Sequence, residues 1–239
     1  MQVIGHRGAK GEAPENTIGG FRYALEKGVT HFELDVRLSA DGQPVIFHDS
    51  TTRRTTGRKH RVASCSTAQL ARMDASHSHA QSWPFFERVP TLLDVLPLLD
   101  KSESIQLEIK SEQTHTQHTL LRAISSVLRD CDPSRYTITS ADKNILTLAR
   151  KLLPDNRRGL VCNRPFINYI TVGHRLECQL LVFQHRLLSQ RNIDQAQQAG
   201  FEVSTYTTND IRRIRKLREW GIDSIITDYP VKYLHLQQA

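Results

Sequence analysis

The sequence predicts an α/β fold, because short apolar segments rich in β-branched residues alternate with helical patterns along all 239 residues. A strand–helix unit repeated about eight times fits either a closed parallel barrel or a doubly wound sheet. Two observations favour the barrel. No Gly-x-Gly-x-x-Gly fingerprint opens a first helix, and the unusual polar residues follow several strands instead of one. We therefore predict a (β/α)8 TIM barrel that forms a single domain over residues 1–239.

Nine segments have the length and composition of buried strands. They are Val3–Ile4, Phe32–Leu38, Val45–Phe47, Ile105–Ile109, Tyr136–Thr139, Gly159–Val161, Leu180–Phe183, Val203–Tyr206 and Ser224–Thr227. Most of the segments between them space their apolar residues at i, i+3 and i+4, as an amphipathic helix does. Gly28, Gly200 and Gly221 each follow such a helix shortly before the next strand, where a left-handed cap ends a helix.

One long segment, from Asp49 to Val89, lacks this periodicity and is rich in Thr, Arg, Ser and His. We predict a loop-rich excursion above the barrel after the second strand, with a short helix near residues Thr67–Met73. His77 and His79 have no partners at metal-ligand spacing, so we predict that they are surface residues.

The composition limits the classes of function. The formal net charge is +7, from 32 basic and 25 acidic residues. This positive charge could bind nucleic acid, an anionic membrane or a phosphate-bearing substrate, or it could lie on a solvated surface that binds none of them. No apolar run approaches the ~18–20 residues of a membrane-spanning helix, and the N-terminus lacks a secretory pattern. The four cysteines form no Cys-x-x-Cys pair, which is typical of reduced thiols, so we predict a cytoplasmic protein.

Acidic side chains lie on two of the predicted strands. Glu33 and Asp35 are two residues apart in "HFELDVRL", so both point to one face of the strand. The same spacing in "LEIK" places Glu108 and Lys110 on one face. Three carboxylates from two strands suit one divalent cation, Mg²⁺ or Ca²⁺, and Lys110 could complement a phosphate oxygen or a carboxylate. The alternatives are a solvated strand face for the first pair and an exposed ion pair for Lys110.

Two histidines follow predicted strands, His6 after the first and His48 after "PVIF". A lone histidine on a loop is more often structural, but a barrel would bring both to one mouth, where they could transfer protons. Arg7 supplies a planar fork of donors that matches phosphate oxygens. These residue types indicate cleavage of a phosphodiester, with the cation and Arg7 stabilising the transition-state charge.

The segment "PENT" (Pro14–Thr17) has the pattern of a helix start, with Asn16 or Thr17 as the cap before Ile18. Capping is the favoured interpretation. The sequence leaves open the alternative that Glu15 or Asn16 also reaches the site.

The ordered set of motifs closely resembles the glycerophosphodiester phosphodiesterase family. The motifs are "HRG" (6–8), "PENT" (14–17), "FELDV" (32–36), "PVIFHD" (44–49) and "LEIK" (107–110), with weaker similarity in "RRTTG" (53–57), "VPTLLDVL" (89–96) and "GIDSIITDYP" (221–230). The resemblance implies a TIM barrel that hydrolyses glycerophosphodiesters, such as glycerophosphocholine, to sn-glycerol 3-phosphate and an alcohol. The roles that it implies are acid–base catalysis by His6 and His48, metal binding by Glu33, Asp35 and Glu108, and phosphate contact by Arg7 and Lys110.

Two departures from the family concern the organic part of the substrate. Where the family commonly has Trp-Thr-Val-Asn after the seventh strand, this chain reads "TYTTND", so Tyr206 replaces the tryptophan as the predicted substrate contact. Where Ser-Phe commonly closes a middle strand, this chain has Ser140-Ala141. Losing a large ring removes apolar contact worth about 1–3 kcal/mol, so the sequence does not fix the head-group preference.

Two other functions are compatible with parts of the sequence. A lysophospholipase D-like enzyme would use the same barrel on lipid phosphodiesters, but no amphipathic helix rich in Trp or Phe is evident. A non-catalytic phosphate- or nucleic-acid-binding module would use the positive charge, but the basic residues are not interleaved with aromatics. We therefore expect a small-molecule substrate, no nucleic-acid partner and no stable membrane insertion. The oligomeric state, the metal and the path of attack, by water or through a cyclic phosphate, are left open.

Overall fold

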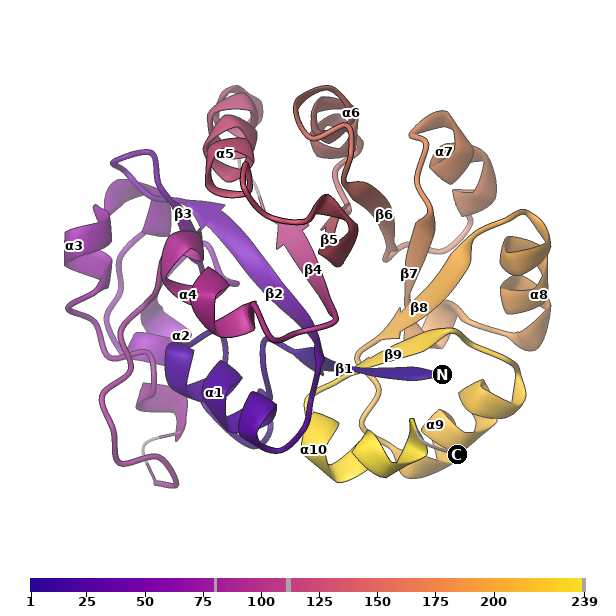
Figure 1. Cartoon of the computed structure of the whole chain (residues 1–239), viewed down its shortest axis with the longest axis horizontal. Helices are drawn as coiled ribbons and strands as arrows, with labels where there is room; N and C mark the ends of the chain where they lie inside the picture. The colour runs from indigo at the N-terminus through magenta and orange to yellow at the C-terminus, as the bar shows by residue number, and fades with distance from the viewer. Residues whose placement is uncertain (80, 111–112, 238–239) are drawn as a thin grey trace.

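Eight parallel strands close into a barrel, with helices outside it, in the computed structural model (Figure 1). The structure describes residues 1–79, 81–110 and 113–237. The barrel strands are β1 (Gln2–His6), β2 (His31–Leu38), β4 (Ser104–Ile109), β5 (Tyr136–Ser140), β6 (Arg157–Cys162), β7 (Leu180–Gln184), β8 (Glu202–Tyr206) and β9 (Ser224–Thr227). β1 pairs with β2 on one side and β9 on the other, so Gly5 lies opposite both Phe32 and Thr227. The predicted TIM barrel is confirmed.

One predicted strand does not belong to the barrel. β3 (Pro44–Ile46) is antiparallel to β2, with Leu38 opposite Pro44 and Val36 opposite Ile46. Only residues 39–43 join the two strands, and a connection that short makes a hairpin because a parallel crossover needs about a dozen residues. The prediction that His48 ends a parallel barrel strand is therefore wrong. β3 instead runs back along β2 and carries His48 to the mouth beside Asp35.

The helices cover the outside of the barrel, and four of their ends lie at the predicted signals. They are α1 (Ile18–Glu26), α4 (Leu92–Leu99), α5 (Thr114–Val127), α6 (Lys143–Leu152), α7 (Tyr169–Arg175), α8 (Gln190–Gln198), α9 (Ile211–Glu219) and α10 (Pro230–Tyr233). Thr17 is the N-cap of α1, and its hydroxyl accepts a hydrogen bond from Gly20 N at 3.0 Å. Gly28, Gly200 and Gly221 all have the positive φ expected after a helix. No helix among the described residues has the length and apolarity to cross a membrane.

β2 is buried on both faces. Phe32, Leu34 and Val36 belong to the apolar core between the barrel and its helices. Glu33 and Asp35 alternate with them and point into the barrel, where they are 3% and 0% exposed. The alternative of a solvated strand face is wrong, because helices cover the outer side of a parallel barrel and side chains fill its interior.

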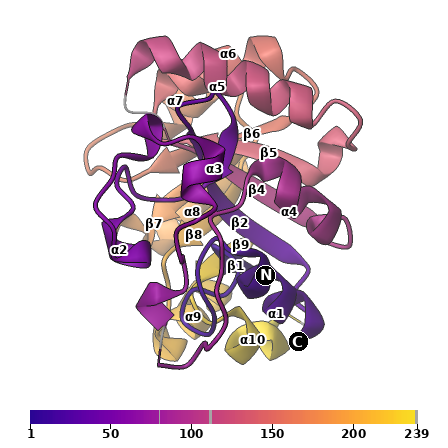
Figure 2. The same ribbon diagram turned by 90° about the vertical axis from the view of Figure 1, so that its left-hand side faces the viewer.

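The excursion after β3 forms a small lobe with its own apolar cluster, which includes Val62, Leu70 and Val89. Its elements are α2 (Arg53–Thr56), α3 (Thr67–Leu70) and the 3₁₀ turns η1 (Val62–Ser64) and η2 (His77–His79); the later 3₁₀ turns are η3 (Pro133–Arg135), η4 (His185–Leu187) and η5 (Leu234–Leu236). The predicted short helix is confirmed as α3. Figure 2 looks at this lobe, with α2 and α3 in front of the barrel strands.

The excursion is fixed to the loop between β1 and α1 and to the first turn of α1. His79 Nε2 lies 3.0 Å from Lys10 O, and Gly19 N donates to Glu87 Oε2 at 3.0 Å. His77 is exposed as predicted, but His79 is half-buried because of its contact with Lys10. All four cysteines are unpaired, as predicted.

Candidate active site

Three carboxylates meet at the mouth of the barrel, two from β2 and one from β4. Glu33, Asp35 and Glu108 each offer an oxygen, and these oxygens lie within 4.8 Å of one another. In the described part of the chain, Glu33 Oε1 is buried without a hydrogen-bond partner, and the buried Asp35 Oδ1 has an ion pair with Lys110 but no hydrogen bond. Buried carboxylate oxygens are costly without a donor or a cation, so this donor set fits a hard divalent cation.

Each carboxylate of β2 responds differently to its surroundings. Burial raises the pKa of Glu33 well above its ordinary value, and the charges of Asp35 and Glu108 raise it further. Burial alone would also raise the pKa of Asp35, but the positive charges of Arg7 and Lys110 outweigh it and hold that pKa below its usual range. The mouth therefore holds a negative charge at Asp35. Beside it, Glu33 ionises only when further positive charge is added.

Two cationic side chains flank the carboxylates. Arg7 Nε lies 3.0 Å from Asp35 Oδ2, and its Nη1 donates to Glu15 Oε1 at 2.8 Å. Lys110 Nζ lies 3.3 Å from Asp35 Oδ1 and contacts Glu108 Oε1 more closely. Lys110 is thus not an exposed ion pair, because its side chain is only 20% exposed.

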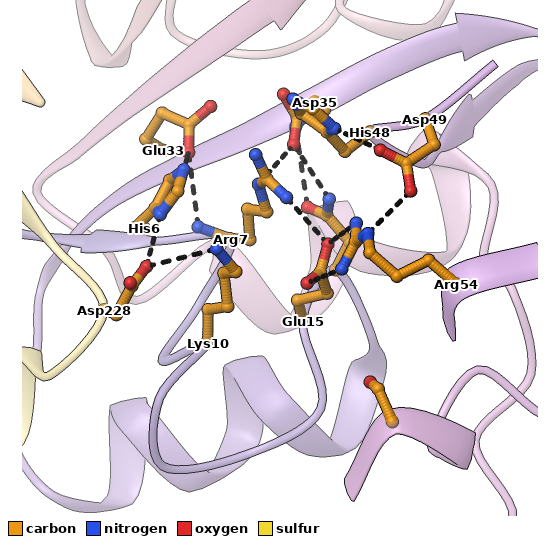
Figure 3. A network of polar contacts seen from close by, with 12 residues as sticks. His6, Arg7, Lys10, Glu15, Glu33, Asp35, His48, Asp49, Arg54 and Asp228 are labelled. Atoms are coloured by element: carbon orange, nitrogen blue, oxygen red, sulfur yellow. Dashed lines mark hydrogen bonds and ion pairs between the residues drawn. The ribbon is translucent and has the colours of Figure 1, made fainter. Parts of the chain in front are cut away.

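His6 is held between two acidic groups (Figure 3). Its Nδ1 lies 2.5 Å from Asp228 Oδ1, and its Nε2 lies 3.9 Å from Glu33 Oε2. Burial lowers the pKa of His6, and the hydrogen bond with Asp228 opposes this effect only in part. Burial would raise the pKa of Asp228, but the hydrogen bond with His6 outweighs it and lowers that pKa to about 2. Asn209 Nδ2 fixes the other oxygen of Asp228 at 2.7 Å.

His48 has a similar arrangement on the opposite side of Asp35. Its Nδ1 lies 2.7 Å from Asp49 Oδ1, and Arg54 Nε donates to Asp49 Oδ2 at 2.7 Å. Burial lowers the pKa of His48, and the negative charge of Asp35 opposes this effect. Each imidazole therefore has a carboxylate at Nδ1, which leaves its Nε2 for other contacts.

The loop after β1 turns sharply to place Arg7. An added Cβ on Gly5 would lie 2.1 Å from Gly8 O, so only glycine fits there. Arg7 and Asn16 have φ of 54° and 55°, in the left-handed region that such residues adopt only when their surroundings hold them. Asn16 Nδ2 donates to Asp35 Oδ2 at 3.0 Å, so both Asn16 and Glu15 reach the site while Thr17 caps the helix.

Tyr206 lines a small cavity inside the mouth together with His6, Glu33 and Glu108. The pKa of Tyr206 is raised by burial and by the charge of Glu108. Ala141 lies outside this cavity and borders an open groove of about 560 Å³. Val161 lines both spaces, so the groove adjoins the carboxylate site.

Comparison with known proteins decides the family. The model of the glycerophosphoryl diester phosphodiesterase family matches residues 6–232, nearly the whole chain. The chain belongs to the glycerophosphoryl diester phosphodiesterase family. The expected family and enzyme class, a glycerophosphodiester phosphodiesterase, are confirmed.

Similar members of this family span the same length. A glycerophosphodiester phosphodiesterase of Caldanaerobacter subterraneus is 29% identical over 98% of this chain and 96% of its own. One from Bacillus altitudinis is 26% identical over 99% and 98%. The solved structure of an Oleispira antarctica phosphodiesterase, in complex with the product sn-glycerol-3-phosphate, has a TM-score of 0.91 and 29% identity, over 100% of this chain and 97% of that one.

Sequence reasoning missed three residues that this phosphodiesterase brings to its mouth. Asp228 lies 222 positions from His6, and neither Asp49 nor Arg54 was predicted as a site residue. The signals were present as the weaker family similarities "GIDSIITDYP" and "RRTTG" and as the aspartate of "PVIFHD". An isolated charged residue forms no repeating pattern with its neighbours in the sequence, so the sequence does not show which distant residue it contacts.

Proposed function

We propose that this chain acts as one catalytic domain that hydrolyses glycerophosphodiesters to sn-glycerol 3-phosphate and an alcohol, with His6 and His48 as the acid–base pair. The observation that carries the proposal is the pair of imidazoles, each bonded at Nδ1 to a carboxylate, on either side of Asp35. Family membership and the product complex of the Oleispira antarctica relative support the substrate class.

A divalent cation, Mg²⁺ or Ca²⁺, is the second part of the proposal. Glu33, Asp35 and Glu108 would hold it, because their oxygens lie close together and the buried Glu33 Oε1 has no hydrogen-bond partner among the described residues. When bound, the cation would supply positive charge next to the phosphate oxygens, where negative charge increases at the transition state.

The cationic side chains of the site would bind and orient the phosphate. Asp35 and Glu15 hold Arg7, and Asp35 and Glu108 hold Lys110, so neither cation is free to move far from the mouth. Charged donors fixed before the substrate arrives need little reorganisation when the charge develops.

Proton transfer is assigned to the Nε2 atoms of His6 and His48. One imidazole would take a proton from the attacking oxygen, and the other would give a proton to the oxygen of the leaving alcohol. Asp228 and Asp49 would fix the tautomer of each ring through Nδ1. The attacking oxygen belongs to water or to the neighbouring glycerol hydroxyl, and a 2-deoxy analogue that binds but is not cleaved would indicate the second route.

The deciding experiment measures release of sn-glycerol 3-phosphate from a panel of glycerophosphodiesters. We expect turnover that EDTA abolishes and that added Mg²⁺ or Ca²⁺ restores. Lysophospholipids in the same panel, with co-sedimentation on liposomes, test the lipid-cleaving alternative. No release from any member of the panel would contradict the proposed function, and near-full activity of His48→Ala would contradict the role of that residue. The cytoplasmic location stays a prediction.

A further inference from the structure

One arginine of the excursion reaches back to the barrel mouth. Arg54 lies on α2 and is 42% exposed, yet its guanidinium contacts two acidic residues of the site (Figure 3). Its Nη1 and Nη2 donate to the two oxygens of Glu15 at 2.6 and 2.7 Å. Its Nε donates to Asp49 Oδ2 at 2.7 Å. All three donor nitrogens of the guanidinium are therefore used in fixed directions.

The two partners of Arg54 lead to different proposed functional side chains. Asp49 binds the Nδ1 of His48 at 2.7 Å. Glu15, which is 4% exposed at its side chain, binds Nη1 of Arg7 at 2.8 Å. Arg54 thus links the His48 ring, which would transfer a proton, to the Arg7 guanidinium, which would orient the phosphate.

We propose that Arg54 is a positioning residue for hydrolysis, which fixes His48 and Arg7 relative to each other through Asp49 and Glu15. This inference rests on the proposed function, because it assigns Arg54 a role through residues of that site. Without Arg54, Asp49 loses a charged donor, so the His48 ring is free to turn away from the phosphate. Displacement of about 1 Å in a reacting group can cost about 10²-fold in rate.

Lysine should not replace this arginine. The guanidinium offers a bidentate edge to Glu15 and a separate N–H to Asp49, whereas an ammonium is a single point charge that can satisfy one carboxylate well. The position of the excursion does not depend on Arg54 alone, because His79 contacts the β1–α1 loop and Glu87 contacts Gly19 of α1. Loss of Arg54 should therefore disturb the site more than the fold.

Arg53 provides a matched control. It lies on the same helix and is exposed, and its side chain makes no hydrogen bond or ion pair within residues 1–79, 81–110 and 113–237. Arg53→Met removes the same charge and the same side-chain type from α2 without touching Glu15 or Asp49. Any effect of the net charge or of the helix itself should be equal in Arg53→Met and Arg54→Met.

The experiment compares steady-state hydrolysis of glycerophosphocholine and glycerophosphoglycerol by the wild type, Arg53→Met, Arg54→Met and Arg54→Lys. We expect kcat to fall about 10–100-fold in both Arg54 variants, with little change in KM, and to stay at the wild-type value in Arg53→Met. Free guanidinium at low concentration should restore part of the activity of Arg54→Met only. The ¹⁵N signals of the His48 ring should show loss of the fixed tautomer in Arg54→Met.

A second variant, Asp49→Asn, tests the same chain of contacts without removing the pair between Arg54 and Glu15. We expect it to lower kcat as well. The double variant should be as active as Arg54→Met alone, since Asp49→Asn breaks one of the two links that Arg54→Met already removes. Equal kcat in Arg54→Met and Arg53→Met would overturn the inference. If Arg54→Met does not fold, a wild-type kcat in Asp49→Asn overturns it. Inactivity of the wild type towards the panel would instead refute the proposed function.

Discussion

The two sides of the barrel mouth are built differently. On the side of β1, β2 and the excursion, charged groups are buried and interlocked, and the side chains of Arg7, Glu15 and Asp35 are at most 9% exposed. On the side of β6 and β7, the surface opens into grooves of about 560 and 650 Å³. Figure 1 shows the excursion and α7–α8 at opposite edges of the barrel. The mouth thus has one side where buried charged groups hold one another, the rigid side, and another where grooves open to solvent, the open side.

The open side is bordered by a short loop with an unusual conformation. Phe166 has a φ of 62° and is fully exposed, while the hydroxyl of Tyr169 ties down the loop by contacting Arg164 N at 2.9 Å and Arg164 O at 3.0 Å. Backbone strain of this kind persists only where the surroundings hold it. The loop is thus rigid at its base and exposes an aromatic ring at its tip.

The largest loss should follow from a change on the rigid side at the carboxylate cluster. We expect Glu33→Gln to lose divalent-cation binding and to reduce hydrolysis to the background of the assay, because it removes one of three converging carboxylates. Isothermal titration with Mg²⁺ or Ca²⁺, alongside product release, provides the measurement. Glu202→Gln, at an exposed position where β8 begins, is the control. Unchanged cation affinity in Glu33→Gln would show that Glu33 is not a ligand.

The next largest loss of activity should follow from replacing His6, and a smaller loss from replacing its partner Asp228. We expect His6→Ala to lower kcat by about 10²–10⁴-fold, as removal of a general acid or base does. Asp228→Asn keeps the ring in place with a weaker partner, so we expect a smaller loss. Kinetic constants on one glycerophosphodiester measure both, with the exposed His115 replaced by alanine as a control. A greater loss in Asp228→Asn than in His6→Ala would contradict this order.

A change on the open side should affect the choice of substrate more than the rate. Ala141→Phe would restore a ring at the groove that adjoins the site through Val161. We expect KM to rise by about tenfold for a diester with a bulky alcohol, because the added ring would occupy space in the groove, and we expect kcat for a small alcohol to stay nearly unchanged. A steric misfit of this size is worth about 1–3 kcal/mol. An equal fall in kcat for all alcohols would mean that this groove is part of the reactive centre.

The smallest effect should come from a helix cap on the open side. Ser189 is the N-cap of α8, where its hydroxyl accepts from Asn192 N at 3.3 Å. We expect Ser189→Ala to lower the free energy of unfolding by about 0.5–1 kcal/mol and to leave hydrolysis unchanged. Urea unfolding and the activity assay measure the two quantities. Loss of activity without loss of stability would show that α8 contributes to the site.

The comparison of the two sides also explains what the sequence could predict. Parallel strands buried on both faces give continuous apolar segments, so every strand was found and Glu33 and Asp35 stood out within one of them. The direction of β3 was missed although "ADGQP" carries Asp41-Gly42, a hairpin signal, and Gly42 has the positive φ of such a turn. The spacing of residues along one strand is visible in a sequence. The direction of the next strand depends on a turn of only two or three residues, which is a weaker signal.

The ion pairs of the excursion could not be predicted in this way. Arg54 and Glu15 are 39 positions apart and meet only because the lobe folds back over the mouth. The sequence shows that Ala141 lacks a large ring, but the groove beside it depends on how α6 and the loop after β6 are placed. Tertiary packing, not local pattern, sets both features.

The seam between β1 and β9 has a consequence for the order of folding. His6 and Asp228 are 222 positions apart, and their contact depends on the pairing of β1 with β9. Until that pairing forms, the barrel is open and the imidazole of His6 has no carboxylate at Nδ1. Contacts between residues so distant in sequence form slowly, so we expect the two ends of the barrel to meet late in folding.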